Sequence, residues 1–417
     1  MTCRHMILAL GIGSWGRAAM ACTLADELTA LGDSGVLLAS ENCIPLLKGS
    51  SFKHDIIPNH MGPFLKLYLD EAFREHCPDS LILSDFFNNT NYLSWRGADP
   101  EILLRDSVET FSLDVWDFSI TGYEIDVFQD DRRLLVQGDH QKWSSRFADI
   151  KHKLRPVPII TPITSDGGFN NIPGHWSKPG PASKLHAQIG LPAGAKAVLF
   201  CTATWQHAEY ESEAGRRMAQ SLPRLLADFL AAAGDQVHLV HVGPKAYPLS
   251  ERMAGRYHWL PALSPGDFDA LLASMDLLLS ANISATTITK AMVLHVPVLV
   301  VENSVAAGSL EQAMAALPHP PSALLESWLR QSLPLFPFSL WPLGYHRFLT
   351  PVLRNNPYVD ALERVEMLDE ATMRRTLATL LFDSVAREEH CHRQQIYLDK
   401  VRSLPSGAQC VRAGLAN

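Results

Sequence analysis

The chain has 417 residues, 47% of them hydrophobic, which is enough for a large core and suits two domains better than one. Its formal net charge of −8 argues against nucleic acid as a main partner, because phosphate backbones are bound by clustered lysines and arginines. The seven cysteines form no CxxC pair, and no apolar run approaches the roughly 20 residues of a membrane-spanning helix. We therefore expect a cytoplasmic protein without stable membrane insertion.

The first forty residues have the pattern of a βαβ unit. An apolar strand over 6–10 leads into a glycine turn, then a helix over about 18–31 and a second strand over 34–39. The turn, Gly11–Gly16, has the form GxGxxG, and Glu41 stands near the end of the second strand. Because this combination is typical of dinucleotide-binding domains, an oxidoreductase that uses nicotinamide or flavin is one alternative.

Asp85 is the next landmark, because it ends a buried apolar strand. A carboxylate at the carboxyl end of a strand in an α/β sheet lies where ligands bind, although the same residue type also caps loops. The chain then becomes rich in proline and glycine over 155–192, which is typical of a linker. We therefore predict an N-terminal domain over 1–175, a C-terminal domain over 176–395 and a tail over 396–417.

The second half contains three strand-end loops that should meet at one edge of a parallel sheet. They are 202–207, 243–245 and 282–287. The last loop lies between an apolar strand and a helix, where free backbone N–H groups and the helix dipole favour a bound phosphate. The candidate ligand-binding residues in these loops are Thr204, Trp205, Gly243, Asn282, Ser284, Thr286 and Thr287.

The stretch 256–297 resembles the donor-binding signature of GT-B nucleotide-sugar glycosyltransferases. That signature is a Trp-x-Pro, then His-Gly-Gly-x-Gly-Thr-x-x-Glu-Ala-Leu and Gly-Val-Pro. Trp259 and Pro261 match the Trp-x-Pro, and the resemblance implies that the Trp259 indole stacks on the nucleobase. The later matching positions are Thr287, Ala291 and Pro297.

This stretch also departs from the signature at several positions. Asn282 replaces the histidine, Ile283 and Ser284 replace glycines, and Lys290 replaces the glutamate. A lysine near a diphosphate is chemically sensible, so we predict Lys290 as a phosphate ligand. Unlike a carboxylate, however, a lysine cannot accept hydrogen bonds from a ribose hydroxyl.

The N-terminal turn resembles the first loop of the same superfamily. Gly13, Ser14 and Gly16 fit this loop, whereas Arg17 occupies the position of the histidine that is the usual general base. An arginine stays protonated and cannot be that base, but it can hold a phosphate or an acceptor carboxylate. Asp85 matches the family's aspartate that orients the histidine. Here it either pairs with Arg17 or itself takes the acceptor's proton.

The segment 336–358 combines aromatic residues, His346, Arg347 and paired asparagines in a loop interrupted by prolines. We expect it to form a binding lid in which His346 or Arg347 contacts the ligand. The base therefore stays open between Asp85, a histidine such as His60 or His346, and no base at all. The run 390–392 (His-Cys-His) does not predict a metal site, because adjacent residues on a helix point about 100° apart.

Taken together, the resemblance implies an α/β protein of the GT-B fold, with two Rossmann-like parallel-sheet domains facing each other across a cleft. It implies transfer of a sugar from a nucleotide-diphosphate sugar to a small, natural-product-like acceptor, with no metal and no cofactor beyond that co-substrate. A homodimer is one option for the assembly. Besides the oxidoreductase, the other alternative is a repurposed GT-B-like protein that acts as a partner or activator, or that catalyses a different condensation.

Overall fold

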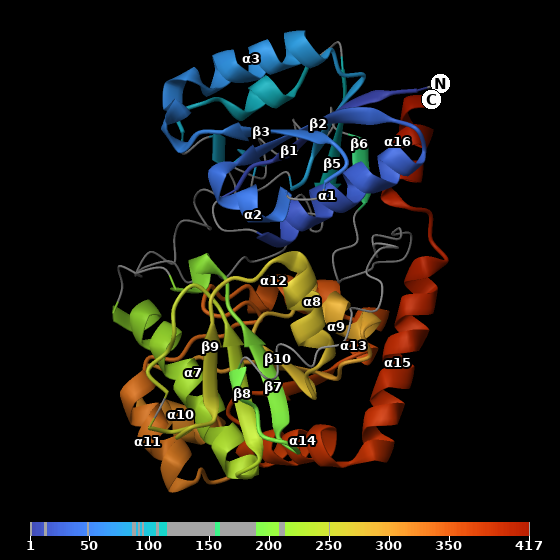
Figure 1. Ribbon diagram of the computed structural model, residues 1–417. Coiled ribbons are helices and arrows are strands. Elements are labelled where there is room, and N and C mark those ends of the chain that lie inside the picture. Colours follow the sequence, from blue (N-terminus) through green and yellow to red (C-terminus); the bar gives the residue numbers. More distant parts are fainter. Residues whose placement is uncertain are drawn as a thin grey trace. The chain divides into compact units, whose positions relative to one another are not determined.

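Figure 1 shows a computed structural model of the chain. It describes residues 2–11, 15–47, 50–85, 89–90, 92–93, 96–105, 108–114, 155–158, 189–207, 213–249 and 251–416. These residues form two compact units. Unit 1 contains the described residues up to 158 together with those from 400 onward, and unit 2 contains residues 189–399.

Unit 1 is built on a six-stranded sheet with the order β3-β2-β1-β4-β5-β6, and every neighbouring pair is parallel. The strands are β1 (Arg4–Ala9), β2 (Ser34–Ser40), β3 (Lys53–Ile57), β4 (Ser80–Leu83), β5 (Glu109–Asp114) and β6 (Arg155–Pro158). The helices are α1 (Trp15–Ala30), α2 (Ile44–Leu47), α3 (Leu65–His76) and α16 (Gly407–Ala416), with 3-10 turns η1 (Glu41–Cys43), η2 (Asn59–Phe64) and η3 (Pro100–Leu103). The central strands β1 and β4 are continuous buried apolar runs, as expected for a parallel sheet covered on both faces.

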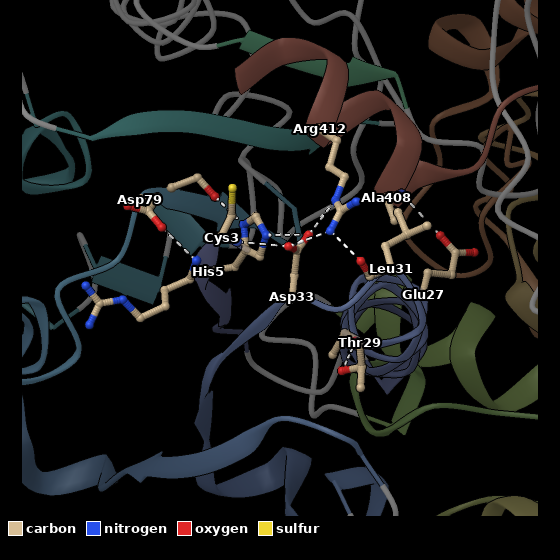
Figure 2. A network of polar contacts seen from close by, with 12 residues as sticks. Cys3, His5, Glu27, Thr29, Leu31, Asp33, Asp79, Ala408 and Arg412 are labelled. Atoms are coloured by element: carbon tan, nitrogen blue, oxygen red, sulfur yellow. Dashed lines mark hydrogen bonds and ion pairs between the residues drawn. The ribbon is translucent and has the colours of Figure 1, made fainter. Parts of the chain in front are cut away.

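The C-terminal helix α16 is part of unit 1, although the sequence analysis treated 396–417 as a tail. Arg412 binds both carboxylate oxygens of the buried Asp33, at 2.8 and 2.7 Å (Figure 2). Asp33 also contacts His5 Nε2 at 3.2 Å and accepts the N–H of Cys3 at 2.9 Å. Burial alone would raise the pKa of Asp33, but hydrogen bonds from Arg412, Cys3 and His5 lower it to about 2. The network therefore joins α16 to β1 and to Asp33, the residue before β2.

Unit 2 has a second six-stranded parallel sheet, with the order β12-β11-β10-β7-β8-β9. Its strands are β7 (Lys196–Cys201), β8 (Val237–Val242), β9 (Tyr257–Leu260), β10 (Leu277–Ser280), β11 (Val298–Glu302) and β12 (Glu363–Glu366). Its helical elements are η4 (Thr204–His207), α7 (Glu213–Ala233), α8 (Pro265–Ala273), α9 (Thr286–Val293), α10 (Leu310–Ala316), α11 (Ala323–Ser332), α12 (His346–Leu353), α13 (Pro357–Asp360), α14 (Glu370–Phe382) and α15 (Ser384–Arg402), of which α15 leads into unit 1. Among the described helices, none has the length and apolar character needed to cross a membrane.

The aromatic part of the segment 336–358 belongs to the core of unit 2, so the expectation of a binding lid is wrong for these residues. Phe338 and Trp341 are completely buried, and the Trp341 indole donates to the carbonyl of Met218 at 3.1 Å. The segment pairs with the ends of two strands, through an Asn303–Phe338 bridge and an Asn282–Leu340 bridge. It therefore packs against the carboxyl ends of β10 and β11 and fixes the loops that follow them.

Candidate functional site

The carboxyl ends of the strands in unit 2 carry most of the predicted ligand-binding residues. In the order β10-β7-β8-β9, neighbouring strands are about 4.8 Å apart, so the ends of β10 and β9 are about 14 Å apart. Open α/β sheets bind ligands at this edge. The edge therefore offers a row of loops about as long as an extended nucleoside diphosphate.

Trp259, on the edge strand β9, is 40% exposed, which is unusual for a large aromatic side chain. Its Nε1–H group donates to the carbonyl oxygen of Gly243 at 3.0 Å, just beyond the end of β8. Because the polar edge of the indole is already satisfied, the part that it offers to a ligand is its apolar face. Such a face stacks well on a nucleobase.

Gly243 has a steric reason to be glycine. A Cβ atom at this position would lie 2.2 Å from Thr202 Oγ1 and 2.6 Å from His241 Nε2. Thr202 Oγ1 is the centre of a polar cluster, at 2.6 Å from His207 Nε2 and 2.8 Å from His241 Nε2. The bare backbone of Gly243 therefore lies directly against this cluster, between it and Trp259.

The cluster continues through two tyrosines behind the loop edge. His241 Nδ1 contacts the hydroxyl of Tyr257 at 2.8 Å, and this hydroxyl accepts the N–H of Tyr247 at 3.0 Å. Burial lowers the pKa of His241 to about 3, with a smaller contribution from His207. Burial, assisted by the charge of Lys245, lowers the pKa of His207 to about 4. Both imidazoles are therefore neutral at pH 7 and act as a rigid support.

The loop between β10 and α9 contains a turn that is closed by the side chain of Asn282. Asn282 Oδ1 accepts the N–H of Ser284 at 3.0 Å and its hydroxyl at 2.9 Å. The N-cap of α9 is Ala285, which has no side chain to cap the helix. Within the part of the chain that the structure describes, the N–H groups of Thr286 and Thr287 have no acceptor. Uncapped N–H groups at a helix start are suited to an anion.

Lys290 lies in the last turn of α9, away from these N–H groups. Its ammonium group is 2.6 Å from Asp269 Oδ1 of α8, and both side chains are mostly buried. The structure therefore places Lys290 in an ion pair. Its predicted role as a phosphate ligand stays a prediction.

The remaining predicted residues of unit 2 lie in η4 and at the start of α12. Thr204 is exposed and Trp205 is half-buried in η4, which Gln206 anchors by donating to the carbonyl of Trp341 at 3.0 Å. His346, the first residue of α12, is half-buried, and its Nδ1 atom is 3.2 Å from the hydroxyl of Ser339.

The predicted residues of unit 1 are described only in part. Asp85 lies two residues beyond the end of β4 and is 7% exposed, and its carbonyl accepts the N–H of Asn89 at 2.9 Å. Arg17 lies in the first turn of α1, but its side chain lies outside the described part of the structure. Gly13 and Ser14 also lie outside the described residues. The structure therefore groups the candidates of unit 2 at one sheet edge and places Asp85 at the corresponding edge of unit 1.

Sequence reasoning missed the supports of this site, which are Thr202, His241, Tyr257, Glu302 and Ser339. One signal was present, because β8 carries two histidines, His238 and His241, among valines and a leucine. A buried histidine in such a strand must find partners, and those of His241 are Thr202, just after β7, and Tyr257 of β9. Ser339 and Glu302 carried no comparable signal. Among the described residues, no group of three or more His, Cys, Asp or Glu side chains is arranged to hold a metal ion.

Comparisons with known proteins agree with this architecture. The model of a family of unknown function, DUF6365, matches residues 24–416, and no curated protein matches the chain. The structure is similar to HepE of Anabaena in complex with UDP-glucose, at 13% identity over 99% of this chain and 98% of that one, with a TM-score of 0.55. It is also similar to UGT89C1 of Arabidopsis thaliana complexed with UDP-L-rhamnose, at 13% identity over 100% of this chain and 99% of that one, with a TM-score of 0.53. A third similar structure is the glycotransferase of kitacinnamycin, at 12% identity over 100% of both chains, with a TM-score of 0.51. Two all-parallel α/β units with these likenesses have the GT-B fold, as the sequence resemblance implied.

Proposed function

This chain belongs to the family of unknown function DUF6365, and we propose that it is a glycosyltransferase that moves a sugar from a nucleotide-diphosphate sugar to a small-molecule acceptor. One observation carries the proposal. An exposed indole, Trp259 on β9, and an uncapped helix start, at Thr286 and Thr287 after β10, lie at the carboxyl edge of one sheet, where the ends of these two strands are about 14 Å apart. A nucleobase and a diphosphate need these two kinds of surface, at this kind of separation.

The donor would lie along the edge of unit 2. Its base would stack on Trp259, its ribose would lie over Gly243, and its diphosphate would accept the N–H groups of Thr286 and Thr287. In the reaction, an acceptor oxygen or nitrogen attacks the anomeric carbon while the bond to the diphosphate breaks. The same N–H groups would then stabilise the negative charge that develops on the leaving group.

The ligands bound to the structural relatives support the donor class. HepE is described with UDP-glucose and UGT89C1 with UDP-L-rhamnose. We extend this class of ligand to the present chain because its Trp259 and its loop 282–287 lie together at the carboxyl edge of one sheet. We do not extend the acceptor, because the acceptor side of unit 1 is described only in part.

A thermal-shift screen tests the proposal. We expect UDP, dTDP or GDP to stabilise the protein by about 2.7 kcal/mol at one hundred times the dissociation constant. Trp259→Leu should abolish most of this stabilisation. Phe382→Leu is a matched control, because Phe382 is similarly exposed (42%) but ends α14, near the start of β7 at the opposite sheet edge.

The screen also separates the alternatives. Stabilisation by NAD(P)H or FAD alone would refute the transferase and favour the oxidoreductase. Stabilisation by a nucleotide sugar that is never cleaved, with any acceptor or with water, would favour a repurposed protein that binds without turnover. A lack of response to every nucleotide would refute the donor site itself.

A further inference from the structure

The structure contains a relay of hydrogen bonds that ends at His346. The relay begins at the buried Glu302, at the carboxyl end of β11. Arg364 of β12 binds Glu302 Oε1 through Nε at 2.6 Å and through a terminal nitrogen at 2.5 Å. The other carboxylate oxygen, Oε2, accepts the hydroxyl of Ser339 at 2.9 Å. Ser339 Oγ in turn lies 3.2 Å from His346 Nδ1.

The direction of the relay determines which nitrogen of His346 carries a proton. A carboxylate that is paired with an arginine can only accept hydrogen bonds, so Ser339 must donate its single hydroxyl proton to Glu302. Ser339 Oγ is then left as an acceptor, and its partner, His346 Nδ1, must carry a hydrogen. In the neutral ring, Nε2 consequently has a free lone pair.

The other side of the ring is open. His346 is half-buried, and no described residue makes a hydrogen bond to its Nε2 atom. The relay therefore ends in a half-buried ring whose Nε2 lone pair has no hydrogen-bond partner among the described residues.

This acceptor lies beside the proposed phosphate loop. The carbonyl of Ser339, the residue that holds the ring, accepts the N–H of Ile283 at 3.0 Å. The neighbouring Leu340 forms a bridge with Asn282, and Trp341 N–H donates to the carbonyl of Ala281 at 2.9 Å. The segment that carries Ser339 is thus hydrogen-bonded along the loop over 281–283.

We propose that His346 is the base that takes the acceptor's proton, and that Ser339 and Glu302 are positioning residues that hold it in the Nδ1–H form. This inference rests on the proposed function. As the acceptor oxygen bonds to the anomeric carbon and the bond to the diphosphate breaks, the hydroxyl proton moves to His346 Nε2. A carboxylate behind an imidazole orients the ring and stabilises the imidazolium that forms.

The charged groups that face the relay favour this role. Glu302 on β11 and Glu366 on β12 are negative, and Arg364 on β12 is positive. Burial raises the pKa of Glu366, although hydrogen bonds from Ser304 oppose this effect. Of these groups, Glu302 is the one that is joined to His346, through Ser339. Asp85 of unit 1 is the rival base.

The test uses the full-length chain and the nucleotide sugar that gives the largest thermal shift, with release of the nucleoside diphosphate as the readout. His346→Gln should keep the thermal shift but lower kcat by about 10²- to 10⁴-fold, the usual contribution of a general base. It should also remove the acidic limb of the pH–rate profile. Ser339→Ala should lower kcat by about tenfold with KM unchanged, because the ring is still present but no longer held.

A spectroscopic measurement distinguishes positioning from mere structural support. In chains labelled with ¹⁵N-histidine, long-range ¹H–¹⁵N spectra should show that His346 carries its hydrogen on Nδ1. In the Ser339→Ala variant, the tautomer equilibrium of this ring should shift towards the Nε2–H form. An Nε2–H ring in the wild-type protein would overturn the relay even if a variant fails to fold.

The kinetic outcomes are equally decisive. A His346→Gln variant that turns over like the wild type, while Asp85→Asn does not, would overturn this inference and leave the proposed function standing. A wild-type protein that binds no nucleoside diphosphate would overturn both.

Discussion

Replacing Gly243 with alanine should damage the proposed nucleotide site, because the added methyl group has no room. The added Cβ would lie 2.2 Å from Thr202 Oγ1 and 2.6 Å from His241 Nε2, far inside contact distance. Thr202 must then move away, which breaks its hydrogen bonds to His207 and His241. Forcing extra volume into a packed site costs about 1–3 kcal/mol. The carbonyl that holds the Trp259 indole shifts with the backbone.

Two measurements on Gly243→Ala check this reasoning. Urea unfolding should show a loss of about 1–3 kcal/mol, and UDP binding by calorimetry should weaken by about tenfold or more because Trp259 loses its anchor. Gly266→Ala is the matched control, since a Cβ at this position in the first turn of α8 would meet nothing within 4 Å. If Gly243→Ala unfolds and binds UDP like the wild-type protein, the support that we assign to Thr202 and His241 is wrong.

Three further predictions concern charged groups. Arg412→Met should destabilise the protein in urea unfolding because the buried Asp33 carboxylate loses its arginine partner and keeps only His5 and the N–H of Cys3, and adding Asp33→Asn should recover part of the loss. Burial raises the pKa of Glu27 to about 7, so ionising this carboxyl opposes folding. The wild-type free energy of unfolding should therefore fall by about 2 kcal/mol as the pH rises from about 5 to 8, and Glu27→Gln should remove this fall; an unchanged slope would contradict the assignment. Lys290→Ala should weaken UDP binding in calorimetry if the ammonium leaves Asp269 for the diphosphate, whereas unchanged affinity would leave Lys290 a structural residue.

The sequence predicted the two sheets because their strands are short, apolar and separated by helices. β4, β8 and β11 are buried along their whole length, and β1 is buried from His5 onward, which is the pattern of a parallel sheet. The placement of α16 was not predictable in this way. Its anchor, the pair Arg412–Asp33, joins residues 379 positions apart, and no local pattern connects an arginine near one end of a chain to an aspartate near the other.

The basis of the predicted site differs from residue to residue. Trp259 was predicted from the family signature and Asn282 from its place after a strand; the structure places both at the carboxyl edge of the sheet, and their role in binding stays a prediction. The lid interpretation was wrong for the aromatic residues of the segment 336–358, because prolines suggested an exposed loop whereas Phe338 and Trp341 are completely buried. The alternation of Phe336, Phe338 and Leu340 was the better signal, since it is the two-residue period of a strand, and these side chains are buried.

Lys290 shows why single positions of a signature transfer poorly between distant proteins. In the resembling family this position is a glutamate, whose carboxylate accepts hydrogen bonds from a ribose. The present chain has a lysine there, but its ammonium is held 2.6 Å from the carboxylate of Asp269, so a carboxylate still lies beside position 290. Only one oxygen of Asp269 contacts the lysine in the described structure, which leaves the other to accept a hydroxyl. The substitution therefore leaves a carboxylate beside position 290, supplied by α8 instead of α9.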